Sequence, residues 1–144
     1  GNGLGGAIQN YASTLTMTNS IVTGNQAVGG AESNGATAGN GQGSGIDTES
    51  DATTTISGGL IAANIARGGA GGGNGFGGGL HSSDGSTTTL TDTIVTLNFA
   101  FGGSGGGQGV GGGAYTTGGT ISLLGKTKVK LNYASTSNNN LFTS

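Results

Sequence analysis

Carboxylate and imidazole side chains are the groups of this chain best suited to acid–base or metal chemistry, and they are few. The only acidic cluster is Asp47, Glu49 and Asp51, in the segment DTESD. Carboxylate oxygens are ligands that Ca²⁺ prefers, but one turn supplies few of them and no acid at the same place in a neighbouring repeat completes a site. We therefore predict a solvated acidic turn, without a metal or cofactor; Ca²⁺ binding by Asp47, Glu49 and Asp51 is the alternative.

The single histidine, His81, is the only candidate for the base of a Ser-His-Asp arrangement. No acid or hydroxyl group has a distinctive spacing to it. We therefore predict that His81 is a surface residue of the turn after GGGL and that the chain is not an enzyme. The chain contains no cysteine, which excludes disulfides, thiolate metal sites and thiol nucleophiles.

Threonines offer a second kind of surface chemistry, because three short segments alternate threonine with other residues. On adjacent strands they would form a grid spaced about 6.7 Å along the strand and about 4.8 Å between strands. Such a grid resembles the ice-binding faces of β-solenoids; the simpler interpretation is that threonine suits an exposed strand. We expect the fourth repeat to break the grid with Ile121, Leu123 and Gly125. The three columns are Thr14, Thr53 and Thr87; Thr16, Thr55 and Thr89; and Thr18, Ser57 and Thr91.

Three of the four cationic side chains lie close together, at Lys126, Lys128 and Lys130. Lysines on a terminal strand protect an open sheet edge from unwanted pairing. The alternative is a contact between this end and the first repeat of another copy, which would build filaments. A sequence pI near 4.9 gives nucleic-acid binding little support.

Four repeats must position these residues. The segments VTGNQA, IAANIA, VTLNFA and VKLNYA share an asparagine followed two residues later by alanine. The asparagines, Asn25, Asn64, Asn98 and Asn132, are 39, 34 and 34 residues apart. Each repeat begins with a glycine-led signal, GGAI, GSGI, GGGL or GGGA. We interpret residues 1–144 as one module of repeats at about 5–42, 43–76, 77–110 and 111–144.

Glycine-rich stretches follow the same period, since RGGAGGGNGFGGGL at 67–80 returns as FGGSGGGQGVGGGA at 101–114. A linker between domains would have no reason to keep this register, so we interpret the glycines as part of the fold. A repeated but disordered arm on each unit remains the alternative. A second column of amides follows from the alignment, namely Asn2, Asn40, Asn74 and Gln108.

Gly, Thr, Ser and Asn with Val and Ile favour short strands and turns over helices. We predict an all-β fold, a right-handed parallel β-helix of about four coils of roughly 34 residues. Each coil would have three short strands and one long glycine-rich corner. The repeated asparagines would form an internal ladder of stacked amides at a corner. The predicted inward columns are Ile8, Ile46, Leu80 and Ala114; Met17, Ile56, Leu90 and Leu124; Val22, Ile61, Val95 and Val129; and Ala27, Ala66, Ala100 and Ala134.

The glycine-led signals and TLTMTNSIVTGN at 14–25 resemble the GGA(I/L/V) and FxxN repeats of polymorphic outer-membrane proteins and other bacterial surface β-helix proteins. Val or Ile stands here where Phe is usual. The resemblance implies an extracellular or cell-surface location. We predict a non-enzymatic structural or adhesive module that binds copies of itself or other surface components, with no membrane span. The alternatives are an ice-binding protein and, with less support from so few clustered charges, a carbohydrate-active β-helix enzyme.

Overall fold

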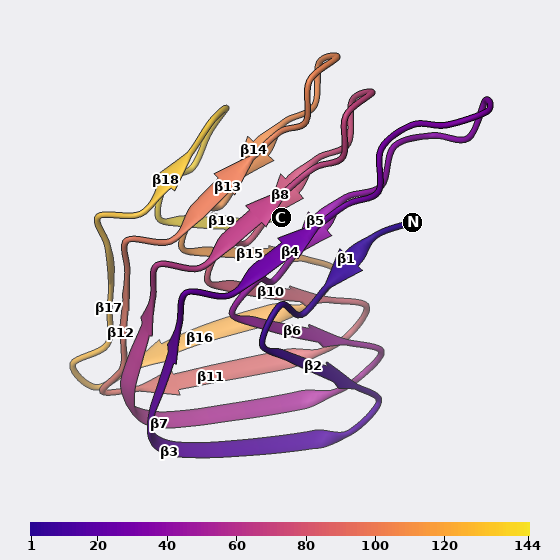
Figure 1. Ribbon diagram of the computed structural model, residues 1–144. Coiled ribbons are helices and arrows are strands. Elements are labelled where there is room, and N and C mark those ends of the chain that lie inside the picture. Colours follow the sequence, from indigo (N-terminus) through magenta and orange to yellow (C-terminus); the bar gives the residue numbers. More distant parts are fainter.

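The computed structural model describes residues 1–144 and consists of strands and turns, without a helix. The chain winds into a parallel β-solenoid of about four turns (Figure 1). Paired residues of the second and third turns are 34 residues apart. Between the first and second turns the spacing is 38 in sheets A and B and 39 in sheets C and D. The predicted all-β solenoid and its period are confirmed.

Four parallel sheets, not three strands and a loop, make up the wall of the solenoid. Sheet A contains β1 (Gly3–Leu4), β5 (Gly41–Gln42), β9 (Gly75–Phe76) and β14 (Gly109–Val110). Sheet B contains β2 (Ile8–Tyr11), β6 (Ile46–Glu49), β10 (Leu80–Ser83), β15 (Ala114–Thr117) and β19 (Leu141–Thr143). Sheet C contains β3 (Thr14–Thr23), β7 (Thr53–Ala62), β11 (Thr87–Thr91), β12 (Ile94–Thr96), β16 (Thr120–Leu124) and β17 (Lys128–Lys130). Sheet D contains β4 (Gln26–Val28), β8 (Ile65–Arg67), β13 (Phe99–Phe101) and β18 (Tyr133–Ala134).

The core is a stack of aliphatic side chains between sheets B and C. Its fully buried members include Ile46, Ile56, Ile61, Leu80 and Leu90. Three of the four predicted inward columns are confirmed by the strand register. Each large aliphatic side chain that is buried stabilises the fold by about 1.5 to 3 kcal/mol. In a chain without disulfides this burial is the main source of stability.

One predicted core position is wrong, because Leu90 pairs with Leu123 and not with Leu124. The fourth coil has two residues between β15 and β16, where the third coil has three between β10 and β11. The fourth coil then has one residue more than the third in the following connection: three residues separate β16 from β17, whereas two separate β11 from β12. The period of 34 therefore hides a shift of one residue, and such a shift turns every side chain of a strand to its opposite face.

Sheet C bends along one column of left-handed residues, Asn19, Gly58, Asp92 and Gly125. Their φ angles lie between 47° and 69°, a region open to glycine and tolerated by asparagine and aspartate. Glycine alternates with Asn or Asp because each side chain reaches over the glycine of the next coil. A Cβ at Gly58 would collide with Asn19 Oδ1, and one at Gly125 with Asp92 Oδ1.

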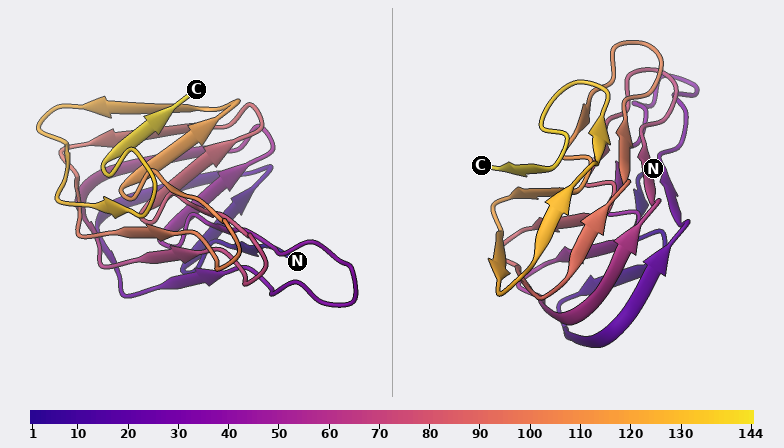
Figure 2. Two further views of the ribbon diagram at one scale, coloured as in Figure 1. Left: turned by 90° about the horizontal axis from the view of Figure 1, so that it is seen from above. Right: turned by 90° about the vertical axis from the view of Figure 1, so that its left-hand side faces the viewer.

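The glycine-rich segments form ordered arms, so the alternative of disordered arms is wrong. Each arm leaves along sheet D and returns along sheet A, and the arm between β4 and β5 projects farthest (Figures 1 and 2). The arms are bonded from coil to coil: Gly69 N donates to Gly39 O at 2.9 Å, and Gly103 N donates to Gly73 O at 2.8 Å. Glycine is needed here because the backbones of sheets A and D approach too closely for a Cβ; at Gly75 it would lie 2.6 Å from Ala66 O.

Candidate functional site

The repeated asparagines lie inside the corner between sheets C and D, and their amides are bonded along the solenoid axis. Asn64 donates both its backbone N, at 3.1 Å, and its Nδ2, at 2.9 Å, to Asn98 Oδ1. Asn98 donates to Asn132 Oδ1 in the same way, at 2.9 and 3.0 Å, and Asn25 does so to Asn64. Each Nδ2 from Asn64 onward also donates to a carbonyl of the preceding coil. From Asn64 onward these side chains are buried and serve the fold.

The second amide column, on the arms, is simpler. Asn40 N donates to Asn2 Oδ1 at 2.9 Å, and Asn74 N donates to Asn40 Oδ1 at 2.8 Å. Gln108 N donates to Asn74 Oδ1 at 2.8 Å.

One member of the first asparagine ladder was missed by the repeat analysis: Asn140 Oδ1 accepts from both N and Nδ2 of Asn132 at 3.2 Å. Asn140 follows Asn132 by eight residues, outside the period.

The threonine columns lie on the outer face of sheet C in the predicted register for the first three coils. The predicted break in the fourth coil is wrong. Thr120, Ser122 and Leu124 continue the three columns there, in place of Ile121, Leu123 and Gly125. The cause is the one-residue shift described above. Four strands therefore contribute to the grid, and Leu124 is its only apolar member.

The lysines lie on the last coil, with Lys128 and Lys130 on β17, the edge strand of sheet C. Lys126 lies in the preceding turn, where its backbone N donates to Asp92 Oδ1 at 2.7 Å. A shallow depression of about 360 Å³ is lined by Asp92, Ile94, Lys126 and Lys128. It is open to solvent and has only one apolar residue in its lining.

The structure corrects the predictions for His81 and Asp47. His81 is on strand β10, not in a surface turn, and is only 1% exposed. Asp47, predicted in a solvated turn, is fully buried on β6 directly beside it. His81 Nδ1 donates to Asp47 Oδ1 at 2.6 Å, and the Gln42 side chain meets His81 Nε2 at 3.4 Å. Asp47 Oδ2 is buried without a hydrogen-bond partner.

Glu49 completes this group, because it is two residues from Asp47 on the same face of β6. One ligand atom from each of Asp47, Glu49 and His81 lies within 4.8 Å of the others. Burial, and next the charge of Asp47, raises the pKa of the Glu49 carboxyl above its ordinary 4.5. Asp51 lies apart, in a left-handed turn after β6. The signal that would have found the pair is the spacing of Asp47 and His81, which is one period of 34 residues.

Aromatic side chains continue the column of His81 toward the last coil. The Tyr115 ring stacks on His81 with ring centres 5.5 Å apart and on Phe142 at 4.8 Å. Phe76, from sheet A, stacks on Tyr115 at 4.6 Å. Burial raises the pKa of the Tyr115 hydroxyl above its ordinary 10. The Tyr115 ring covers one face of the imidazole, and His81 is almost fully buried, which shields it from an organic substrate that would need it as a general base.

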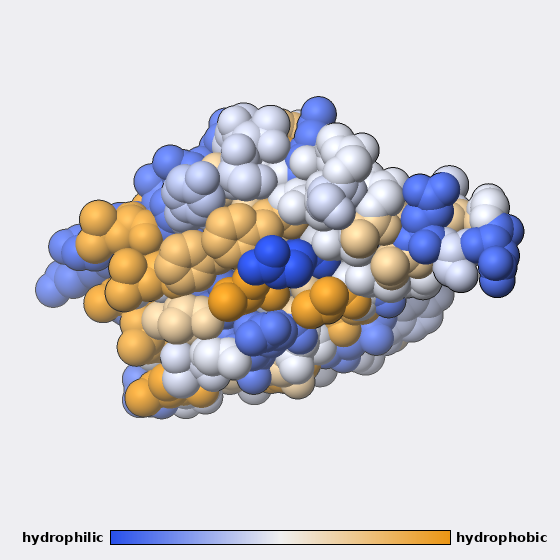
Figure 3. Space-filling view, turned by 45° about the horizontal axis from the view of Figure 1, so that its top comes forward, coloured by the Kyte–Doolittle hydropathy of each residue, from blue (hydrophilic) through white to orange (hydrophobic).

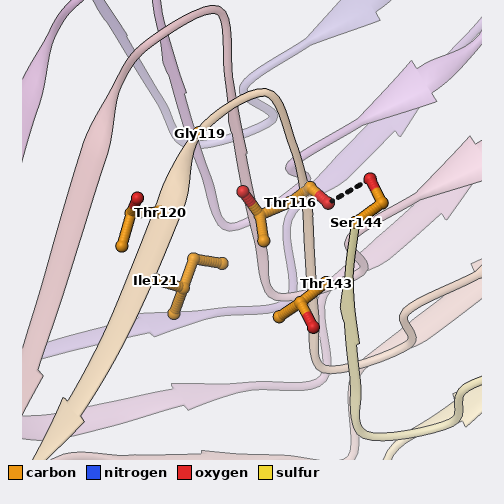
Figure 4. Close-up of a pocket in the computed structure, with 6 residues that line it drawn as sticks. All are labelled: Thr116, Gly119, Thr120, Ile121, Thr143 and Ser144. Carbon is orange, nitrogen blue, oxygen red and sulfur yellow. Dashed lines mark hydrogen bonds between the residues drawn. The ribbon is translucent and has the colours of Figure 1, made fainter.

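Polar side chains also line the inner corner between sheets B and C, where only apolar side chains were predicted to point inward. Thr48 and Thr54 share a hydrogen bond of 2.9 Å, and so do Ser82 and Ser86. Thr116, the partner of Ser82 in the strand register, continues this column, but its Oγ1 is buried without a hydrogen-bond partner. Thr116 also lines a hollow of about 230 Å³ at the end of the core. Figure 4 shows its lining residues, Thr116, Gly119, Thr120, Ile121, Thr143 and Ser144.

An exposed apolar band runs over the corner between sheets C and D and across the outer face of sheet D (Figure 3). We define the apolar band as Ile21, Val28, Ile94, Leu97, Phe99, Phe101, Leu131 and Tyr133. Leu97 is 51% exposed and Leu131 is 69% exposed. The one arginine, Arg67, lies over the Phe101 ring, with Cζ 4.9 Å from its centre.

The structure has no helix long and apolar enough to cross a membrane. Comparison with known proteins returned no matching family model, no matching curated protein and no matching solved structure.

Proposed function

We propose that the chain is a non-enzymatic structural and adhesive module of a secreted or surface-displayed protein, and that it attaches through the apolar band. The observation that carries the proposal is the conformation of Leu97 and Leu131. Both adopt the left-handed region, with φ of 54° and 55°, although both are largely exposed. A bulky side chain in this region costs about 1 to 2 kcal/mol, and in the free chain no burial offsets that cost.

The neighbouring positions support this interpretation. Gly24 and Ala63 occupy the positions equivalent to Leu97 and Leu131 in the first two coils. The left-handed turn between sheets C and D therefore does not require a large side chain. Exposed aromatic and aliphatic residues then extend the surface across sheet D. A contiguous apolar patch on a rigid scaffold is typical of an interaction site. Its occupant would be an apolar surface, either an abiotic or cellular one or the band of a second copy.

The double variant Leu97→Asn, Leu131→Asn tests this proposal, because asparagine tolerates the left-handed region better than leucine. We expect the fold to be kept or stabilised while attachment weakens. Retention of chain-coated beads on alkyl-coated glass under flow should fall by about tenfold, the equivalent of about 1.4 kcal/mol. Urea unfolding of the two proteins measures the stability.

The matched control is Tyr11→Asn, Leu124→Asn, which removes two side chains of similar exposure, 62% and 50%, outside the band. This control should leave retention unchanged. Equal retention of all three proteins would refute the proposal. Sedimentation velocity of the unmodified chain distinguishes attachment to a target from self-association through the band.

Ice binding is the second candidate, and the corrected register favours it more than the sequence did. The grid has four rungs on a face without charged side chains, since Thr120 and Ser122 extend the first two columns. The regular spacing of the grid would allow its hydroxyl and methyl groups to order water together. If the face binds ice, the chain produces thermal hysteresis and Thr89→Tyr, at the centre of the grid, abolishes it.

Thr23→Tyr is the control for this measurement, because Thr23 is exposed on β3 but lies outside the grid. It should leave the hysteresis intact. Lack of hysteresis in the unmodified chain removes the ice-binding candidate without any variant.

A further inference from the structure

The group formed by Asp47, Glu49 and His81 is not used by the proposed adhesive function. It lies on the outer face of sheet B, in the angle that this sheet makes with sheet A. Asp47 and Glu49 come from the second coil and His81 comes from the third, directly across the strand pair. The ligand atoms lie within 4.8 Å of one another. Two consecutive coils thus present three side chains toward one point.

The charges at this point are not balanced within the chain. The contact of His81 Nδ1 with Asp47 Oδ1 is the only one in the structure between a basic and an acidic side chain, and no lysine or arginine neutralises Glu49. Asp84 adds a further negative charge close to Glu49. Most decisive is Asp47 Oδ2, which is buried without any donor. A buried carboxylate oxygen without a partner is costly, and a cation is the partner that would remove this cost.

The donor types indicate the class of cation. Ca²⁺ and Mg²⁺ prefer sites built from oxygen alone, whereas an imidazole nitrogen suits Zn²⁺ and related transition metals. Donor atoms around one zinc ion lie about 3.4 Å apart. His81 Nδ1 and Asp47 Oδ1, which are 2.6 Å apart, would therefore have to separate by roughly 0.8 Å, and Glu49 would have to move inward by roughly 1 Å. Glu49 is the half-exposed member of the group and is free to do so.

The surroundings of the imidazole also fit metal binding at Nδ1. In the structure Nδ1 carries the proton that it donates to Asp47, and the Gln42 amide donates to Nε2. When a metal takes Nδ1, the ring proton moves to Nε2, and the Gln42 amide turns over so that Oε1 accepts it. Partners that hold the second ring nitrogen in this way are typical of metal-binding histidines.

We propose that Asp47, Glu49 and His81 bind a divalent transition-metal ion that joins the second and third coils. The site leaves at least one coordination position for water. The ion's role is to lock the register of β6 and β10 on the outer face of sheet B. Neither the apolar band nor its attachment depends on it.

Calorimetric titration of the tag-free, metal-free chain with Zn²⁺ tests the site. We expect one ion per chain with micromolar or tighter affinity, and Ca²⁺ binding at least about tenfold more weakly. His81 is the only histidine, so its imidazole NMR signals report directly whether the ion binds the ring. Zn²⁺ should shift these signals and raise the unfolding temperature.

Glu49→Gln is the decisive variant, because Glu49 is half-exposed and its loss does not threaten the fold. It should weaken Zn²⁺ binding by about tenfold or more. Glu32→Gln removes the same charge from an exposed arm and should have no effect. The proposal is overturned if Zn²⁺ does not bind, if binding leaves the imidazole signals unmoved, if both variants bind as the parent does, or if Ca²⁺ binds as tightly as Zn²⁺.

Discussion

Replacement of Asn98 by leucine is expected to destabilise the solenoid by about 3 to 5 kcal/mol. Asn98 is fully buried. Its Oδ1 accepts from both N and Nδ2 of Asn64, and its Nδ2 donates to Ile61 O at 2.9 Å and to Asn132 Oδ1 at 3.0 Å. Leucine is similar in size but leaves these buried partners unsatisfied in two neighbouring coils. Urea unfolding followed by circular dichroism measures the loss.

Asn2→Leu is the control, because Asn2 is exposed and accepts a single bond, from Asn40 N. Its cost should be below about 1 kcal/mol. Both variants replace asparagine by leucine, so the difference between their unfolding free energies reports the effect of burial and of the number of hydrogen bonds. Equal, small costs in both would mean that the corner is held by the backbone ladder alone.

The repeats predicted the fold well because stacking repeats the same physical environment every 34 residues. Asn98 and Asn132 could be placed together from their spacing, and so could Ala100 and Ala134. This inference fails where two changes of length cancel within one repeat. Leu123 and Leu124 are adjacent and both apolar, so neither composition nor period could distinguish the one that pairs with Leu90 from the one that continues the threonine column of Thr91.

The group around His81 was missed for a different reason. Aspartate and histidine were each assessed for chemistry within one segment, whereas a solenoid brings together residues from consecutive coils. Alignment of Ile46 with Leu80 already placed Asp47 beside His81. What the alignment could not supply was burial, because the cover comes from sheet A: Gln42 meets the imidazole, and Phe76 stacks on the Tyr115 ring beside it. The packing of these sheet A side chains against sheet B was not predictable from the repeat.

Replacement of Gly75 by alanine is expected to destabilise the fold by about 3 kcal/mol or more, at the upper end of overpacking costs. A Cβ at Gly75 would lie 2.6 Å from Ala66 O and closer still to Phe101 O. Both neighbours are backbone atoms of sheet D, which are fixed by the hydrogen bonds of their own sheet and cannot move individually. Sheets A and D would have to separate along the whole arm.

Gly30→Ala is the matched control, since Gly30 also lies in an arm and its added Cβ would meet only Gly1, at 3.2 and 3.3 Å. Its expected change in unfolding free energy is within about 0.5 kcal/mol, because alanine also reduces the entropy of the unfolded chain. If only the number of glycines mattered, the two variants would change the unfolding free energy equally. A large cost confined to Gly75 would show that glycine is required where two sheet backbones touch, and equal costs would refute the close packing of sheets A and D.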